Sequence, residues 1–139
     1  MYEDNNTLAA ERKVIDFLCE LWHMDAAKLP IAYNVDYAMF KDGKLRAWME
    51  VKCRYCASSQ YDTYFISAKK IVNGIQLSET TGMPFVLAVQ WEDKIGYMPV
   101  LKGSFDIRIG GRQDRHDWQD VEPMAHFRIQ DFKMIDHAS

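Results

Sequence analysis

The sequence lacks any long apolar run. No apolar stretch in this chain of 139 residues approaches the length of about twenty residues that a membrane-spanning helix needs. Residues 1–6 are acidic, whereas a secretory signal peptide begins with a basic segment. These two absences predict a soluble cytoplasmic protein with no membrane partner.

Cysteine is also scarce. The chain has three cysteines, Cys19, Cys53 and Cys56, and an odd number in a chain without an export signal indicates reduced thiols. Cys53 and Cys56 have the spacing of half a zinc site, but no second cysteine pair accompanies them, and the four histidines show no matching spacing. We expect neither a disulfide nor a zinc ion.

An overall positive charge is missing as well. The net charge of −3 does not by itself indicate nucleic-acid binding. Between Lys41 and Lys70, however, seven basic residues face three acidic ones. A basic surface around an acidic pocket would suit phosphate binding, although a solvated, charged hairpin explains the same charges equally well.

The composition provides enough apolar material for one compact core. Hydrophobic residues make up 48% of the chain and aromatic residues 13%, values that argue against disorder. At this length a division into two cores is not expected. The composition therefore predicts a single domain over residues 1–139.

An amphipathic helix is predicted over about residues 8–24. Val14, Ile15 and Leu18 form one apolar stripe at helical spacing, and Glu11 falls on the same stripe. A buried carboxylate needs a partner or a metal ion. The alternative is that the helix dipole favours an acid near the N-terminus regardless of function.

A hairpin is predicted next. Residues 31–40 and 45–54 are strand-like, and the connection between them contains Asp42-Gly43, whose residues tolerate the positive φ angles of a tight hairpin turn. Strand alternation places apolar side chains on one face of the second strand and polar side chains on the other.

The polar face of this hairpin carries the candidate site. Glu50 and Lys52 point to the same side of the second strand, and the hairpin brings Asp36 near them. Two carboxylates suit Mg²⁺, which prefers oxygen ligands, including substrate phosphates and waters. A cation held there could lower the pKa of a water and stabilise negative charge on phosphorus, while the lysine holds or deprotonates the attacking water.

A second helix is predicted over residues 68–81, between Ser67 as N-cap and Gly82 as C-terminal stop. Its buried stripe is expected to contain Ala68, Ile71, Val72 and Ile75. Lys69 and Lys70 lie in the first turn, where the helix dipole disfavours cations. A nearby anion such as a DNA phosphate would explain them, as would an ordinary solvated surface.

Four further strands are predicted from apolar patterns. Residues 85–91 indicate a strand buried on both faces, and residues 95–100 indicate its hairpin partner, placed at a sheet edge by Pro99. Residues 105–109 and 126–129 alternate like edge strands.

Three segments are predicted as loops or connections. Residues 25–30 form a short connection, and residues 55–62 form a loop at the rim of the pocket, where Arg54 and Tyr55 could contact a substrate. A third loop over residues 110–118 contains Arg112, Arg115 and Trp118, and solvation explains it better than nucleic-acid binding.

The spacing of Asp36 and the Glu50-Val51-Lys52 triplet resembles the PD-(D/E)xK nuclease superfamily, in which the Asp ends one hairpin strand and E-x-K lies on the next. Val35 stands where that motif has proline. The resemblance covers about residues 8–100 by motif and by order of elements. It implies an α/β fold of the restriction-endonuclease-like type: a mixed central sheet flanked by helices, with additional strands at the C-terminal end of this chain.

The resemblance also implies a function. It implies a Mg²⁺-dependent or Mn²⁺-dependent deoxyribonuclease that leaves 5′-phosphate and 3′-hydroxyl ends, in which Asp36, Glu50 and the Val51 carbonyl bind the metal. Lys52 would position the water, and Glu11 would support the site on the metal or through a water. Small members include branched-DNA resolvases and phage-type nucleases, often dimeric, so the expected partners are DNA rather than RNA and a second copy, in a bacterial or phage-infected cell. The expected DNA contacts are Arg54, Tyr55, Lys69 and Lys70.

Two other functions fit the same residues. In a catalytically inactive nucleic-acid-binding or assembly module of the same fold, Glu50 and Lys52 would form an ion pair on a solvated sheet face. A small metal-dependent enzyme acting on a phosphate ester outside nucleic acids would suit the modest number of basic residues.

Overall fold

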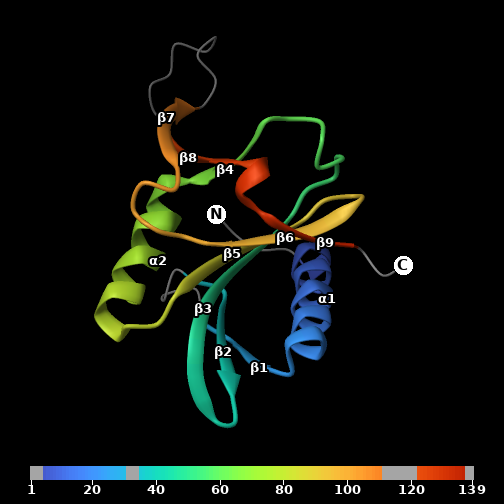
Figure 1. The fold of residues 1–139 in the computed structure, drawn as a ribbon, viewed down its shortest axis with the longest axis vertical. Coiled ribbons are helices and arrows are strands. Elements are labelled where there is room, and N and C mark those ends of the chain that lie inside the picture. The colour runs from blue at the N-terminus through green and yellow to red at the C-terminus, as the bar shows by residue number, and fades with distance from the viewer. Residues whose placement is uncertain (1–4, 31–34, 111–121, 137–139) are drawn as a thin grey trace.

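The structure, a computed structural model, describes residues 5–30, 35–110 and 122–136. In this part of the chain a central sheet separates helix α1 (Asn5–Trp22) from helix α2 (Ala68–Thr81) and a smaller sheet (Figure 1). No helix in the described ranges is long and apolar enough to cross a membrane.

The central sheet is mixed, as predicted. Its strand order is β1-β2-β3-β5-β6-β9. Only β3 and β5 run parallel, and every other neighbouring pair is antiparallel. The strands are β1 (Asp25–Lys28), β2 (Tyr37–Lys41), β3 (Lys44–Cys53), β5 (Phe85–Gln90), β6 (Lys94–Pro99) and β9 (Lys133–Asp136). Helix α2 lies in the connection between the parallel strands, because two parallel strands cannot be joined by a tight turn.

The smaller sheet contains two of the additional C-terminal strands, and β9 of the central sheet is the third. The smaller sheet has the order β4-β8-β7, with β4 (Thr63–Ser67), β7 (Asp106–Gly110) and β8 (Glu122–Arg128). A short 3₁₀ helix, η4 (Ile129–Asp131), leads from β8 to β9. The C-terminal segment therefore completes both sheets.

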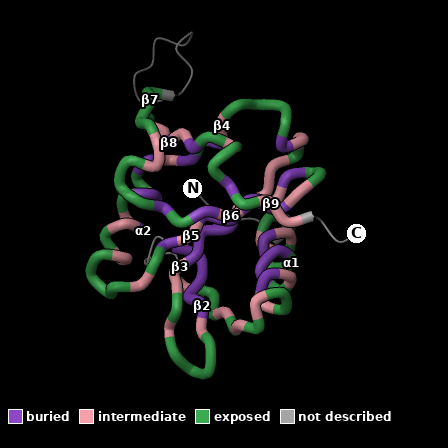
Figure 2. The backbone as a smooth tube through the Cα atoms, viewed as in Figure 1, coloured by how far each residue is buried: buried purple, intermediate pink, exposed green. Residues whose placement is uncertain are grey.

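The two faces of β3 pack against different layers. Met49 and Val51 belong to a buried cluster with Val14, Ile15 and Leu18 of α1. Buried residues of β5 and of the smaller sheet form a second cluster on the opposite side, and Trp48 packs against it. Figure 2 shows the buried segments along the middle of the central sheet and on α1. This division confirms the strand alternation predicted for β3.

The predicted hairpin turn is present between β2 and β3. Lys41 pairs with Lys44, so the turn consists of Asp42 and Gly43, whose φ angles are 53° and 74°. Positive φ at both central positions is the geometry that matches the twist of a hairpin. Further along the ladder Tyr37 lies opposite Met49, which places Asp36 across from Glu50.

Several predicted boundaries were wrong. Residues 25–28 form β1, which pairs along β2, instead of a connection without a strand. Their sequence, Asp-Ala-Ala-Lys, has low strand propensity, so tertiary pairing rather than local preference decides their conformation. Helix α1 begins at Asn5 and ends at Trp22, immediately before His23, whose φ of 55° is left-handed. Residues 31–34 of the predicted first hairpin strand lie outside the described residues.

The predicted edge position of residues 95–100 was also wrong. Strand β6 is flanked by β5 and β9. Strand β9 pairs only with residues 94–97, so Pro99 lies beyond its end and costs no hydrogen bond on that side. Residues 126–129 were predicted as an edge strand, yet β8 is the central strand of the smaller sheet. In the predicted loop over residues 110–118, Gly110 ends β7, and Arg112, Arg115 and Trp118 lie outside the described residues.

The buried side of α2 differs at one predicted position. Ala68, Ile71 and Gly74 are buried, whereas Val72 is 47% exposed. The ring of Phe85 lies so close to Gly74 that a Cβ atom there would overlap it. The helix therefore approaches β5 along its glycine side and turns Val72 outward.

Candidate functional site

Asp36, immediately before β2, lies across from Glu50 of β3. Asp36 is 4% exposed and Glu50 is fully buried. The backbone N–H of Val51 donates a hydrogen bond to Asp36 Oδ2 at 3.1 Å. The structure thus brings together the two carboxylates that strand alternation placed on one face.

The backbone groups of Val51 are directed towards Asp36. Trp48 N–H and Arg54 N–H donate to carbonyls beside and at the end of β5, so even-numbered residues of β3 direct their backbone groups towards β5. Val51, an odd-numbered residue, directs its N–H to Asp36. In an extended strand the C=O of a residue points to the same side as its N–H. The Val51 carbonyl is therefore directed to the Asp36 side.

Glu50 holds its proton strongly. Burial raises the pKa of Glu50, and the negative charge of Asp36 raises it further; Lys70 and Lys52 lower it without outweighing the burial, and the resulting pKa is about 8. Its Oε1 atom is buried and has no hydrogen-bond partner among the described residues. A buried carboxylate oxygen without a partner is costly, so this position favours an additional electropositive ligand.

Three lysines surround the carboxylates. Lys28 Nζ lies 3.6 Å from Asp36 Oδ1, Lys52 Nζ lies 3.6 Å from Glu50 Oε2, and Lys70 Nζ lies 3.2 Å from the same Glu50 oxygen. The sequence indicated this proximity only for Lys52. Lys28 lies on β1, which was not predicted as a strand, and Lys70 was predicted only as a DNA contact. The local sequence of neither segment indicates that a carboxylate from a distant segment lies nearby.

Glu11 is buried on the predicted stripe of α1, at 2% exposure. The negative charge of Glu11 acts on groups near the site. It raises the pKa values of Tyr37 and Cys53, although burial raises both of them more. No group of three or more His, Cys, Asp or Glu side chains in the described ranges is arranged to hold a metal ion. Participation of Glu11 in a metal site stays a prediction.

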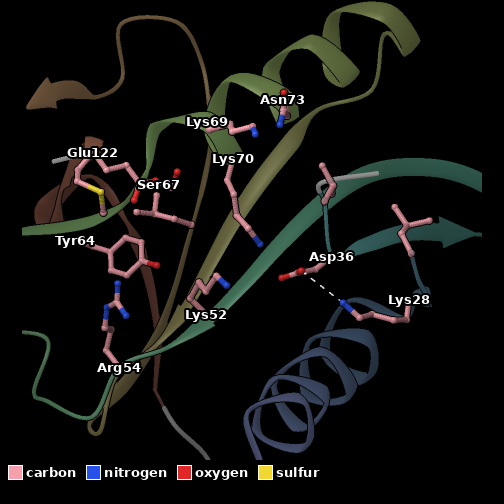
Figure 3. A pocket seen from close by; sticks show the side chains of 14 residues that line it. Lys28, Asp36, Lys52, Arg54, Tyr64, Ser67, Lys69, Lys70, Asn73 and Glu122 are labelled. Atoms are coloured by element: carbon pink, nitrogen blue, oxygen red, sulfur yellow. Dashed lines mark ion pairs between the residues drawn. The ribbon is translucent and has the colours of Figure 1, made fainter. Parts of the chain in front are cut away.

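A cavity of about 580 Å³ opens beside the carboxylates (Figure 3). It lies between the Asp36 end of the central sheet, the beginning of α2 and the smaller sheet. Its charged lining is predominantly basic, and Glu50 itself lies behind it, in contact with the ammonium groups of Lys52 and Lys70. The lining includes Lys28, Asp36, Lys52, Arg54, Tyr64, Ser67, Lys69, Lys70, Asn73 and Glu122.

The predicted DNA contacts are placed differently from one another. Arg54 and Lys69 line the cavity. The Arg54 guanidinium lies 4.7 Å from the ring centroid of Tyr64 and donates a hydrogen bond to the Phe65 carbonyl at 2.9 Å. Tyr55 is 83% exposed and is not part of the cavity wall. The roles of all four predicted contacts, Lys70 included, stay predictions.

The donor set fits a hard divalent cation. Oxygen atoms come from Asp36, Glu50 and the Val51 carbonyl, which lie close together at the start of β2 and on β3. Mg²⁺ is usually held by one or two carboxylates with further oxygens from substrate and water. The unpartnered Oε1 of Glu50 is the atom that such an ion would satisfy. The three cysteines are free thiols, so they offer no disulfide.

The fold and the motif define a class. A mixed sheet between helices, with Asp36 at one hairpin strand and Glu50-Val51-Lys52 on the next, has the restriction-endonuclease-like architecture of PD-(D/E)xK nucleases. The family model described as "Phage putative PDDEXK endonuclease" matches residues 1–135. The chain belongs to this nuclease family.

A solved structure supports the same fold. The chain is similar to the Holliday junction resolvase Hjc of Archaeoglobus fulgidus, with a TM-score of 0.52 and 17% sequence identity. The similarity covers 81% of this chain and 85% of that chain. At this identity the similarity concerns the fold alone. No curated protein matches the sequence.

Proposed function

We propose that this protein is a divalent-metal-dependent nuclease that hydrolyses phosphodiester bonds in DNA, with Mg²⁺ or Mn²⁺ as cofactor. The juxtaposition of Asp36 and Glu50, with Lys52 beside them and one Glu50 oxygen left without a partner, carries the proposal. Membership of an endonuclease family supports it.

Asp36, Glu50 and the Val51 carbonyl would hold the ion. When bound, a divalent cation lowers the pKa of a coordinated water and offsets negative charge on phosphorus. Lys52, whose ammonium lies within 3.6 Å of Glu50, would donate a hydrogen bond to the attacking water and orient it. Glu11 would support the site from α1.

The basic cavity wall would bind the DNA backbone. Arg54 and Lys69 line the cavity and would contact phosphate oxygens, and the exposed Tyr55 would contact DNA outside the cavity wall. Lys70 would contribute positive charge next to Glu50. Hydrolysis by water attack on the phosphorus would leave 5′-phosphate and 3′-hydroxyl ends, as the family resemblance implies.

Branched DNA is the substrate that we propose to test first. The chain shares its fold with a protein whose name states that it is a Holliday junction resolvase, although fold alone does not determine substrate. We propose a homodimer as well, because small members of the superfamily that the chain resembles are often dimeric, and a second copy would supply a second site for the other strand of a junction. Light scattering of the purified protein measures this directly.

The decisive experiment is a cleavage panel of duplex, single-stranded, flap and four-way-junction DNA with Mg²⁺ or Mn²⁺. We expect wild type to cut at least one substrate and Glu50→Ala to cut none. Glu79→Ala, a surface glutamate paired with Lys102, serves as the matched control and should cut like wild type. A wild-type protein that cuts nothing in the panel would refute the proposal.

One observation favours a second candidate, an inactive DNA-binding or assembly module. Each carboxylate is already paired with a lysine, Asp36 with Lys28 and Glu50 with Lys70, so the protein's own cations already offset both negative charges. A metal titration separates the two functions, because an ion that binds only the folded protein raises Tm. The nuclease requires Mn²⁺ to raise the Tm of wild type but not of Asp36→Asn, whereas the module requires no shift in either.

A further inference from the structure

Tyr64, on β4, is held rigidly at the cavity wall. It is 3% exposed and makes edge-to-face contacts with Trp91 and Phe132, at centroid distances of 6.3 Å and 6.4 Å. The Arg54 guanidinium lies 4.7 Å from its ring centroid. The ring therefore has aromatic neighbours that fix its orientation and a cation on its face.

The hydroxyl group of Tyr64 has no such partner. The oxygen is buried and has no hydrogen bond to any described residue. Buried tyrosine hydroxyls are normally paired, since leaving one unpaired costs free energy. Figure 3 shows the hydroxyl directed towards the interior of the cavity, on the side where the Lys52 and Lys70 side chains end. Packing explains the ring, but it does not explain the hydroxyl.

The surroundings indicate what the hydroxyl would bind. It remains protonated, because burial and then the charges of Glu50, Glu11 and Asp36 raise the pKa of Tyr64, although Arg54 lowers it. It is therefore a hydrogen-bond donor. The charged lining of the cavity that it faces is predominantly ammonium and guanidinium groups. These cations cannot accept a hydrogen bond, but they do attract an anion with acceptor oxygens.

We propose that the Tyr64 hydroxyl donates a hydrogen bond to a non-bridging phosphate oxygen of DNA bound in this cavity. The inference rests on the proposed nuclease function and adds to it a substrate-contacting residue that the sequence motif does not contain. The buried aromatic neighbours hold the donor in place before DNA binds, so little side-chain entropy is lost when the contact forms.

The test uses Tyr64→Phe, which removes the hydroxyl and keeps the ring. Binding of four-way-junction DNA is measured with EDTA present, so that the readout does not depend on cleavage. We expect Kd to rise about tenfold or more, the usual effect of losing a hydrogen bond to a charged group. We expect Tm of the free protein to stay equal or to rise, because an unpaired buried hydroxyl is lost.

Tyr97→Phe is the matched control. Tyr97 packs edge-to-face on Trp22 at 5.0 Å, in the cluster on the α1 side of the central sheet. Tyr97→Phe should change neither the Kd for DNA nor the rate of cleavage. If Tyr64→Phe binds DNA as tightly as wild type, or if its Tm falls by several degrees, the inference is overturned while the nuclease proposal stands. If wild type neither binds nor cuts any DNA, both fail together.

A double-mutant cycle between the protein and the DNA identifies the phosphate that Tyr64 contacts. Single methylphosphonates placed along the DNA each weaken one protein–phosphate contact. At one position we expect a methylphosphonate to weaken binding by wild type but to cause little further loss with Tyr64→Phe, because the same contact is already missing. Additive losses at every position would contradict a direct contact.

Discussion

The ammonium of Lys70 lies 3.2 Å from Glu50 Oε2, closer than the motif lysine Lys52, which lies 3.6 Å from the same oxygen. A lysine from α2 therefore accompanies the E-x-K triplet of β3. Because Lys70 lowers the pKa of Glu50 more than Lys52 does, it favours the ionised carboxylate, the form that the proposed cation would bind. This relationship between two elements far apart in the sequence has measurable consequences.

The first prediction concerns the protonation of Glu50. Lys70→Met removes a positive charge and keeps most of the side-chain volume, so the pKa of Glu50 should rise above its value of about 8. A rise of about one unit or more is expected for the loss of an adjacent opposite charge. Carboxyl-carbon NMR of the metal-free protein measures it. Lys102→Met, which removes a surface partner of Glu79, should leave the titration unchanged, and an unshifted Glu50 in Lys70→Met would refute the expected coupling.

The second prediction concerns stability and pH. The pKa of Glu50 is about 8 in the folded protein against 4.5 for an ordinary glutamate, so the folded state binds this proton more tightly than the unfolded state. Glu50 therefore makes stability fall as the pH rises from 4.5 to about 8. Each unit of difference is worth about 1.4 kcal/mol.

Glu50→Gln should remove this pH dependence. In the absence of metal the variant should melt several degrees above wild type at pH 8 and show a much smaller difference at pH 4.5. Thermal melts at the two pH values measure the effect. An equal difference at both, or a variant that is less stable at pH 8, would mean that Glu50 is ionised in the folded protein at neutral pH.

The third prediction concerns DNA binding through Lys69. This exposed residue lines the cavity, so a phosphate contact by Lys69 should release about one counterion. Lys69→Ala should weaken binding and reduce the slope of log K against log salt by about one. Lys13→Ala, on an exposed part of α1, is the control. If both variants keep the wild-type slope, Lys69 does not contact the backbone.

The fourth prediction concerns the packing that positions α2. A Cβ at Gly74 would overlap the Phe85 ring, so Gly74→Ala must displace the helix or the ring. We expect a loss of about 1–3 kcal/mol in the free energy of unfolding, measured by urea denaturation. The exposed substitution Gln76→Ala should change it by less than about 0.5 kcal/mol. Wild-type stability in Gly74→Ala would mean that the helix can move without cost.

Local patterns were sufficient to predict the hairpin. Asp42-Gly43 fixed the turn, and alternation along β3 separated Met49 and Val51 from Glu50 and Lys52. These features depend on residues close together in the sequence. The signal at the C-terminal end of α2 was equally local, since Gly82 has the left-handed conformation expected at the end of a helix. Ser67 does precede the helix, but its side chain makes no capping hydrogen bond.

Contacts between distant segments could not be predicted in the same way. The short strand β1 has no apolar pattern and exists because it pairs with β2. The positions of Lys28 and Lys70 beside the carboxylates, and of the Tyr64 hydroxyl at the cavity, arise only when β1, α2 and β4 pack around β3. The pairing of charged side chains from distant segments depends on the tertiary structure, and the periodicity of the sequence does not indicate it.

The central claim is that Asp36, Glu50 and Lys52 form a metal-dependent phosphodiester-cleaving site. The most direct test is the rate of DNA cleavage with saturating Mg²⁺ or Mn²⁺ by wild type and by Lys52→Ala, each confirmed to be folded. We expect wild type to cleave and Lys52→Ala to lose about 100-fold or more of the rate, the contribution usual for a residue that assists proton transfer. Cleavage by Lys52→Ala at the wild-type rate would contradict the account.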